Sequence, residues 1–234
     1  SGSRHLYRNF ELRNTNATKT ASIGIQCDGG LCVVREIVIT HSTNKFWKGV
    51  QTTGGLILRD SKIKNCANVG VDCPSAESIE IVNNLIKSNG SHGLSLNGLI
   101  IGAQVIRKNV ISGNSGDGIS LNATGTGATR RGVDISENTI DANTSDAIHA
   151  DRASTQLVLY QNLLILNNQL TNNGVYALNF DGAGVTDVFL DSVGCQIRNN
   201  NQFNNTSGLS NLTLTFAENT TNLNPGYTDT GLDN

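Results

Sequence analysis

The chain has 234 residues, of which only 15% are charged, and its formal net charge is −2. A nucleic-acid-binding protein would usually carry a basic stripe, whereas the basic residues here are scattered, with Arg130-Arg131 as a tight pair. The apolar runs, such as Leu163–Leu166, have only the length of a strand and fall far below the ~20 residues needed to cross a bilayer. Neither a nucleic-acid partner nor a membrane span is therefore expected.

The N-terminal part of the chain carries only degenerate copies of a pattern that is regular further on. Residues 1–3 resemble the remnant of an expression tag. Residues 4–55 are expected to form a cap and irregular first coils of a repeat structure, with Arg4–Thr20 as the cap itself, because the end of a stacked repeat exposes unpaired strand edges.

Five cysteines are spread through the chain, an odd number. Their spacings do not form the two close pairs of a typical zinc site. Buried thiols or one or two local disulfides remain as alternatives, and the sequence does not decide between them. The five are Cys27, Cys32, Cys66, Cys73 and Cys195.

Residues 56–181 contain the regular repeat, five copies of a segment that align without a gap around one aliphatic position. Apolar residues alternate with period 2 and are rich in Ile and Val, which predicts strands rather than helices. Successive copies are 23, 25, 29 and 30 residues apart, with the extra length in residues 123–132 and 152–162. The central position is occupied by Ile63, Ile86, Ile111, Ile140 and Leu170.

Asparagine recurs at two further positions of each copy. Asn tolerates left-handed backbone and bonds to neighbouring amides. Stacked at the ~4.8 Å spacing of strands, equal Asn side chains are expected to hydrogen-bond along the rod. The two columns are Asn84, Asn109, Asn138 and Asn168, and Asn89, Asn114, Asn143 and Asn173.

The pattern Ile-x-x-Asn-x-Ile-x-x-Asn-x-x-x-Gly-Ile-x-Leu resembles the repeat of the pectate-lyase-like superfamily. This resemblance implies an all-β fold, a right-handed parallel β-helix (solenoid) of about seven to nine coils. Residues 1–234 would then form a single domain, in which residues 182–234 supply irregular last coils and an exit segment. The superfamily includes polysaccharide lyases, glycoside hydrolases, epimerases, tailspikes and adhesins, so the fold leaves the function open.

Strand alternation points some columns outward, and on successive coils these columns gather acidic and histidine residues. Two neighbouring carboxylates can raise one another's pKa, as acid–base chemistry on a glycosidic bond requires. The alternative is that each Asp is a turn residue that recurs because the turn recurs. The catalytic candidates are Asp117, Asp146, His149 and Asp151.

A second set of residues is suited to binding a sugar. The arginines could hold an acidic sugar, and the tyrosine could stack on a sugar ring. No metal site and no cofactor is assigned, with Ca²⁺ as the weaker alternative because it prefers clustered oxygen ligands. The binding candidates are Arg130, Arg131, Arg152, Tyr176, Asn179, Asp181 and His92.

The expected function is recognition of a polysaccharide or glycan by an extracellular, cell-surface or virion module similar to a tailspike or adhesin. The alternatives are a polysaccharide-modifying enzyme (glycoside hydrolase, lyase or C5-epimerase) and a non-catalytic structural rod. A homotrimer, or further domains of a longer native chain, would cover the open end of the last coil. Convergence of the candidate carboxylates and His149 would favour the enzyme.

Overall fold

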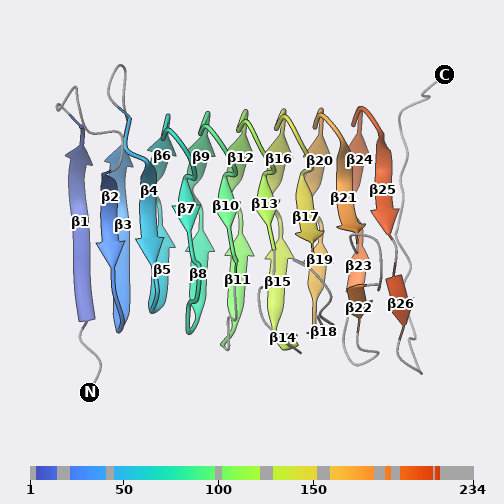
Figure 1. Cartoon of the computed structure of the whole chain (residues 1–234), viewed down its shortest axis with the longest axis horizontal. Helices are drawn as coiled ribbons and strands as arrows, with labels where there is room; N and C mark the ends of the chain where they lie inside the picture. The colour runs from blue at the N-terminus through green and yellow to red at the C-terminus, as the bar shows by residue number, and fades with distance from the viewer. Residues whose placement is uncertain are drawn as a thin grey trace.

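The computed structural model describes residues 4–14, 22–40, 45–97, 102–121, 129–151, 159–181, 188–190, 196–212 and 214–216. In these ranges the chain forms a rod of stacked coils, with β1 at one end and β25 and β26 at the other (Figure 1). The strand pairings are parallel and form three sheets. The fold is a parallel β-helix, as the repeat predicts.

The largest sheet has 14 strands and covers two sides of the rod. The long strand β3 (Leu31–Ile39) pairs with β1 (Arg4–Leu12) and also starts both arms of the sheet. One arm is β5 (Gly55–Arg59), β8 (Ile79–Val82), β11 (Gln104–Arg107), β15 (Val133–Ser136), β19 (Leu164–Leu166) and β23 (Gln196–Arg198). The other arm is β6 (Lys62–Lys64), β9 (Leu85–Lys87), β12 (Val110–Ser112), β16 (Thr139–Asp141), β20 (Gln169–Thr171) and β24 (Asn201–Phe203).

An eight-stranded sheet forms the third side, and a four-stranded sheet lies beside the later coils. The eight strands are β2 (Ile23–Cys27), β4 (Lys48–Thr52), β7 (Val71–Asp72), β10 (Leu94–Ser95), β13 (Ile119–Ser120), β17 (Ile148–Asp151), β21 (Tyr176–Asp181) and β25 (Gly208–Leu212). The four strands are β14 (Thr129–Arg131), β18 (Leu159–Gln161), β22 (Val188–Leu190) and β26 (Leu214–Phe216).

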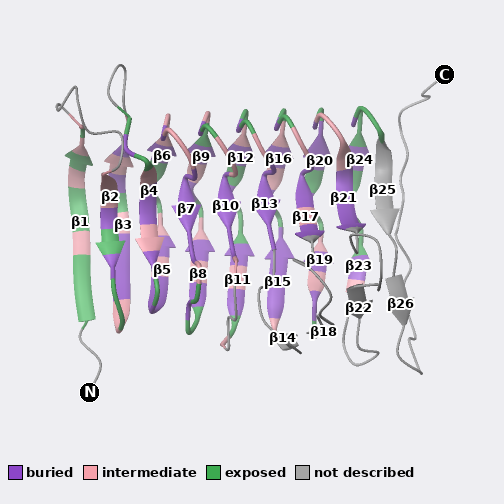
Figure 2. Ribbon diagram, viewed as in Figure 1, coloured by how far each residue is buried: buried purple, intermediate pink, exposed green. Residues whose placement is uncertain are grey.

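The core is the inside of the rod, and it is built from the aliphatic columns of the repeat. Ile86 pairs with Ile111, Ile111 with Ile140, and Ile140 with Leu170 on successive coils. All four are fully buried, and Figure 2 shows buried residues along the strands of every middle coil. The predicted stacking of these positions is confirmed.

The two asparagine columns form continuous hydrogen-bond ladders. In the first ladder, the backbone N–H and the side-chain Nδ2 of Asn109 both donate to Oδ1 of Asn138, each at 3.0 Å. Asn143 donates to Asn173 in the same way in the second ladder. The ladders also continue beyond the regular repeats, to Asn200 and Asn205.

The left-handed backbone lies one residue before each ladder position, not at the ladder Asn itself. Lys108 and Glu137, which precede Asn109 and Asn138, have φ values of 56° and 58°. Tolerance of left-handed backbone is therefore not what places Asn at the ladder positions. Its amide is needed instead to bond the next coil, and the bend falls on its neighbour.

A small residue recurs where each coil passes beneath the central column of the next. A Cβ added at Gly118 would lie 2.3 Å from Cγ2 of Ile140, a β-branched residue. One coil later the small residue is Ala147, and the central residue of the next coil is Leu170, which has no Cγ2 methyl. The identity of the small residue thus follows the branching of the side chain that packs on it.

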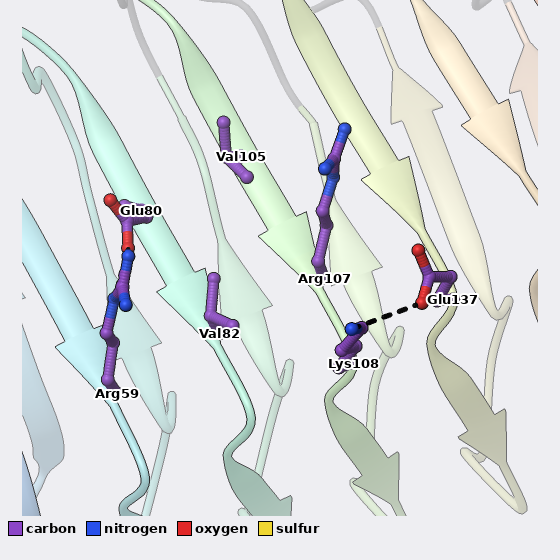
Figure 3. Close-up of a pocket in the computed structure, with 7 residues that line it drawn as sticks. All are labelled: Arg59, Glu80, Val82, Val105, Arg107, Lys108 and Glu137. Atoms are coloured by element: carbon purple, nitrogen blue, oxygen red, sulfur yellow. Dashed lines mark hydrogen bonds and ion pairs between the residues drawn. The ribbon is translucent and has the colours of Figure 1, made fainter.

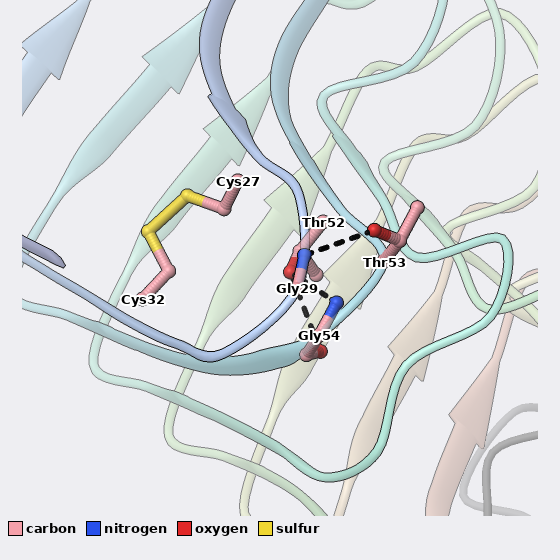
Figure 4. The surroundings of a disulfide bond; sticks show 6 residues. All are labelled: Cys27, Gly29, Cys32, Thr52, Thr53 and Gly54. Atoms are coloured by element: carbon pink, nitrogen blue, oxygen red, sulfur yellow. Dashed lines mark hydrogen bonds between the residues drawn. A yellow bond between two sulfur atoms is a disulfide. The ribbon is translucent and has the colours of Figure 1, made fainter. Parts of the chain in front are cut away.

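A buried disulfide joins Cys27 at the end of β2 to Cys32 at the start of β3. It closes the turn beside Gly29, whose N–H donates to Oγ1 of Thr53 at 3.3 Å (Figure 4). Cys66 and Cys73 are buried free thiols, whereas Cys195 lies outside the described residues.

Candidate functional site

The outer face of the eight-stranded sheet carries an unbroken column of polar side chains, one on each strand from β2 to β21. The strand register pairs each member with the next at adjacent Cα positions. Each of these side chains can donate or accept a hydrogen bond. The column consists of Gln26, Gln51, Asp72, Ser95, Ser120, His149 and Asn179.

Two carboxylates from the turns before β13 and β17 converge on His149. Oδ2 of Asp117 lies 3.3 Å from Nδ1 of His149, and Oδ2 of Asp146 lies 3.6 Å from the same nitrogen. The three ligand atoms lie within 4.8 Å of one another. The structure therefore brings together three of the four predicted catalytic residues.

The other oxygen of each carboxylate is bound to the backbone of the following coil. Oδ1 of Asp117 accepts the N–H of Asp146 at 3.1 Å, and Oδ1 of Asp146 accepts the N–H of Tyr176 at 2.8 Å. Asn179 also donates from Nδ2 to Oδ2 of Asp146 at 2.9 Å. These contacts fix the orientation of both carboxylates, and each Asp bonds to the backbone of the next coil as a turn residue would.

The carboxylates are not on the exposed strand face, as the catalytic alternative supposed. Asp117 and Asp146 have relative exposures of 3% and 2%, because their side chains turn towards the backbone of the neighbouring coil. The side chains of His92 and His149 are more open, with relative exposures of 29% and 23%. Solvent therefore meets the imidazoles more than the carboxylates.

The two carboxyl groups have pKa values that move in opposite directions. Burial alone would raise the pKa of Asp117, but the hydrogen bonds from His149 and His92 and the attraction of His149 hold it well below its usual range. Burial raises the pKa of Asp146, and it outweighs the hydrogen bonds from Asn179 and the Tyr176 backbone. Asp146 therefore binds a proton more readily than Asp117 does, and neighbouring carboxyl groups with separated pKa values are typical of acid–base sites.

His92 lies one coil before Asp117 and contacts it twice through the same atom. Its Nδ1 accepts the backbone N–H of Asp117 at 3.1 Å and lies 3.1 Å from Oδ2 of that residue. One ring nitrogen cannot accept and donate at once. The tautomer protonated at Nε2 therefore accepts the backbone N–H, whereas a ring protonated at Nδ1 donates to the carboxylate.

The remaining predicted residues are not assembled with this cluster by any described contact. Arg131 is exposed on β14 of the four-stranded sheet. Asp151 and Asp181 pair in register on β17 and β21, but their side chains, like that of Arg130, lie outside the described residues. Arg152 lies wholly outside them.

Ser120 lies one strand from His149 in the same column, and the residue types alone did not single it out. It is fully buried, it pairs in register with His149, and its Oγ has no hydrogen-bond partner among the described residues. The only signal in the sequence is its place in the outward column, one coil before His149.

A shallow depression of about 340 Å³ lies elsewhere, on the outer face of the 14-stranded sheet. Its charged side chains pair with one another across adjacent strands, as Arg59 does with Glu80 and Lys108 with Glu137 (Figure 3). Exposed ion pairs of this kind contribute about 0–1 kcal/mol. Their mutual pairing leaves this depression a weaker candidate than the cluster around His149.

A sequence model described as a right-handed beta helix region matches residues 4–132, more than half of the 234 residues. The chain therefore belongs to the right-handed β-helix family, in agreement with its resemblance to pectate-lyase-like proteins. No curated protein and no solved structure matches it. Within the described ranges, no helix is long and apolar enough to cross a membrane.

Proposed function

We propose that the protein is an extracellular or virion-surface module that binds a polysaccharide along the outer face of the eight-stranded sheet. The observation that carries this proposal is the polar column from Gln26 to Asn179, in which Gln26, Gln51 and His149 reach solvent while the other four members are buried. Its members repeat at the ~4.8 Å spacing of neighbouring strands. A linear polymer with hydroxyl groups on every unit can bond to the members of this column that reach solvent.

The cluster around His149 is the part of this face best suited to contact a sugar. His92 and Tyr176 are also partly exposed there, and an aromatic ring with a polar end can pack on a sugar ring while bonding to its hydroxyls. The buried carboxylates behind the imidazoles hold them in place, so little conformational entropy is lost when a ligand binds.

Binding is tested on a glycan array with the wild-type chain and two variants. Gln51→Ala alters the polar column on β4, and Lys87→Ala removes an exposed side chain from β9 of the 14-stranded sheet. We expect the Gln51 variant to bind the selected glycan more weakly and the Lys87 variant to bind as the wild type does. Absence of any glycan ligand, or equal losses in both variants, would refute the proposal.

Acid–base catalysis on the same polysaccharide is the second candidate, and the opposed pKa shifts of Asp117 and Asp146 favour it. In a hydrolase, Asp146 would protonate the departing sugar oxygen as the general acid. In a lyase or epimerase, His149 would remove the proton beside a uronic acid.

Turnover of array-selected glycans, followed by product analysis, tests this candidate. Asp146→Asn is expected to abolish turnover, and Asp134→Asn serves as the control because Asp134 is a carboxylate of the 14-stranded sheet paired with Arg107. Equal turnover by wild type and Asp146→Asn would rule out the acid role. Binding without turnover would leave the module as a recognition protein.

A further inference from the structure

We propose that Asp117, Asp146 and His149, with Ser120 beside them, form a binding site for one divalent transition-metal ion of the zinc class. The proposal concerns a ligand that neither polysaccharide binding nor acid–base catalysis requires. It stands on the positions of four side chains and does not depend on the proposed function.

The spacing of the three donor atoms suits a small ion. Zinc binds imidazole nitrogen at about 2.0–2.1 Å and carboxylate oxygen at about 2.0–2.2 Å. Tetrahedral bonds of this length place neighbouring donors about 3.3 Å apart. Nδ1 of His149 lies 3.3 Å from Oδ2 of Asp117 and 3.6 Å from Oδ2 of Asp146, so two of the three edges are close to this value.

The donors are also held in position by the fold. Each carboxylate keeps Oδ1 on a backbone N–H of the next coil and presents Oδ2 to His149. Asn179 bonds Oδ2 of Asp146 from the following coil. Outer contacts of this kind orient the ligands of metal sites and raise their affinity.

Ser120 supplies an independent indication of a missing partner. Its hydroxyl is fully buried and has no hydrogen-bond partner among the described residues. A buried polar group without a partner is rare, because it has lost its hydrogen bonds to water without gaining others. Ser120 lies on the same outward column as His149, one strand away, so its Oγ can meet the metal or a water bound to it.

The donor set selects the type of ion. Ca²⁺ and Mg²⁺ take oxygen ligands, and Ca²⁺ needs six to eight of them. An imidazole donor suits Zn²⁺ and its neighbours instead. Two carboxylates also balance the charge of one divalent ion, and three protein ligands leave a position open for water or a sugar oxygen, as in catalytic zinc sites.

Isothermal titration of chelator-treated protein with Zn²⁺ tests the site, with Ca²⁺ titrated in parallel. We expect one zinc ion per chain and much weaker calcium binding. His149→Gln leaves both carboxylate-to-backbone contacts in place and is expected to weaken zinc binding at least about tenfold. His5→Gln is the matched control, since His5 is an exposed histidine on β1, and it is expected to bind zinc as the wild type does.

X-ray absorption of the zinc-loaded wild type tests the ligands without any variant. We expect a single imidazole among light donors at about 2.0–2.2 Å. The proposal is overturned by the lack of stoichiometric zinc binding, by equal zinc affinity in His149→Gln, by calcium binding as tight as zinc, or by a spectrum with no imidazole or with several. None of these results bears on glycan binding by the metal-free chain.

Discussion

Replacing one asparagine of the first ladder should remove a large part of the stability of the rod. In Asn138→Ala the lost side chain accepts two hydrogen bonds from Asn109, at 3.0 Å each, through its Oδ1. Its Nδ2 donates to the carbonyl of Ile106 at 2.9 Å and to Oδ1 of Asn168 at 3.0 Å. The side chain is only 1% exposed, so water does not replace these partners freely.

The size of the effect follows from these four contacts. Each hydrogen bond contributes about 1 kcal/mol net, and a buried group left without a partner costs about 1–3 kcal/mol. The backbone N–H of Asn109 would lose its acceptor. We therefore expect a loss of about 3–5 kcal/mol in the free energy of unfolding, out of the about 5–15 kcal/mol typical of a domain.

Urea unfolding followed by circular dichroism measures this loss, and hydrogen exchange locates it. The amide of Asn109 should exchange faster in the variant, because adjacent coils contact only their neighbours. Asn201→Ala is the control, since Asn201 is exposed on β24, and a change within about 0.5 kcal/mol is expected there. A loss below about 1 kcal/mol in Asn138→Ala, or equal losses in the two variants, would refute the ladder as a major source of stability.

Three further predictions concern other parts of the rod. Gly118→Ala should destabilise the fold by about 1–3 kcal/mol through overpacking. Adding Ile140→Leu should recover part of that loss, because it removes the Cγ2 methyl that the new Cβ would meet. Additive losses of the two substitutions in a double-mutant cycle would contradict this account. Folding lowers the pKa of Asp117, so the ionised carboxylate stabilises the fold above its unfolded pKa of about 4, and this contribution is lost as the pH falls. The melting temperature should therefore fall less steeply between pH 7 and pH 2 in Asp117→Asn than in the wild type. Parallel curves for the two proteins would contradict a stabilising role of the Asp117 charge. Reduction of the Cys27–Cys32 disulfide should lower the free energy of unfolding by about 2 kcal/mol, since the two cysteines are 5 residues apart. Urea unfolding with and without reductant measures this difference. Unchanged unfolding midpoints would exclude the contribution.

Much of the fold could be predicted because each coil needs the same type of residue at the same position, so the pattern recurs several times. The central column needs an aliphatic residue on every coil, so equivalent positions carry Ile86, Ile111 and Ile140 and can be aligned with one another. The asparagines recur for the same reason, since Oδ1 of each Asn accepts a hydrogen bond from the Asn of the preceding coil. Redundancy of this kind makes stacking visible in a single sequence.

The site was predicted only in part, because it occurs once and has no repeat to mark it. The sequence placed Asp117, Asp146 and His149 on neighbouring coils, which the structure bears out. It did not indicate that the two carboxylates are buried, nor that Asn179 bonds to one of them. Those features depend on side-chain rotamers and on which groups of the adjacent coil remain available.

The sequence by itself determined the stacking of coils, the apolar columns inside them and the positions of the two asparagine ladders, since period-2 alternation and equal spacing suffice to specify them. Only the tertiary structure decided where the left-handed residues fall, which of Gly or Ala fits beneath a given side chain, and how the oxygens of Asp117 and Asp146 divide between backbone and imidazole. The physical reason is that the alternation of apolar and polar residues is set along one coil, whereas a hydrogen bond between coils depends on atoms some 30 residues apart.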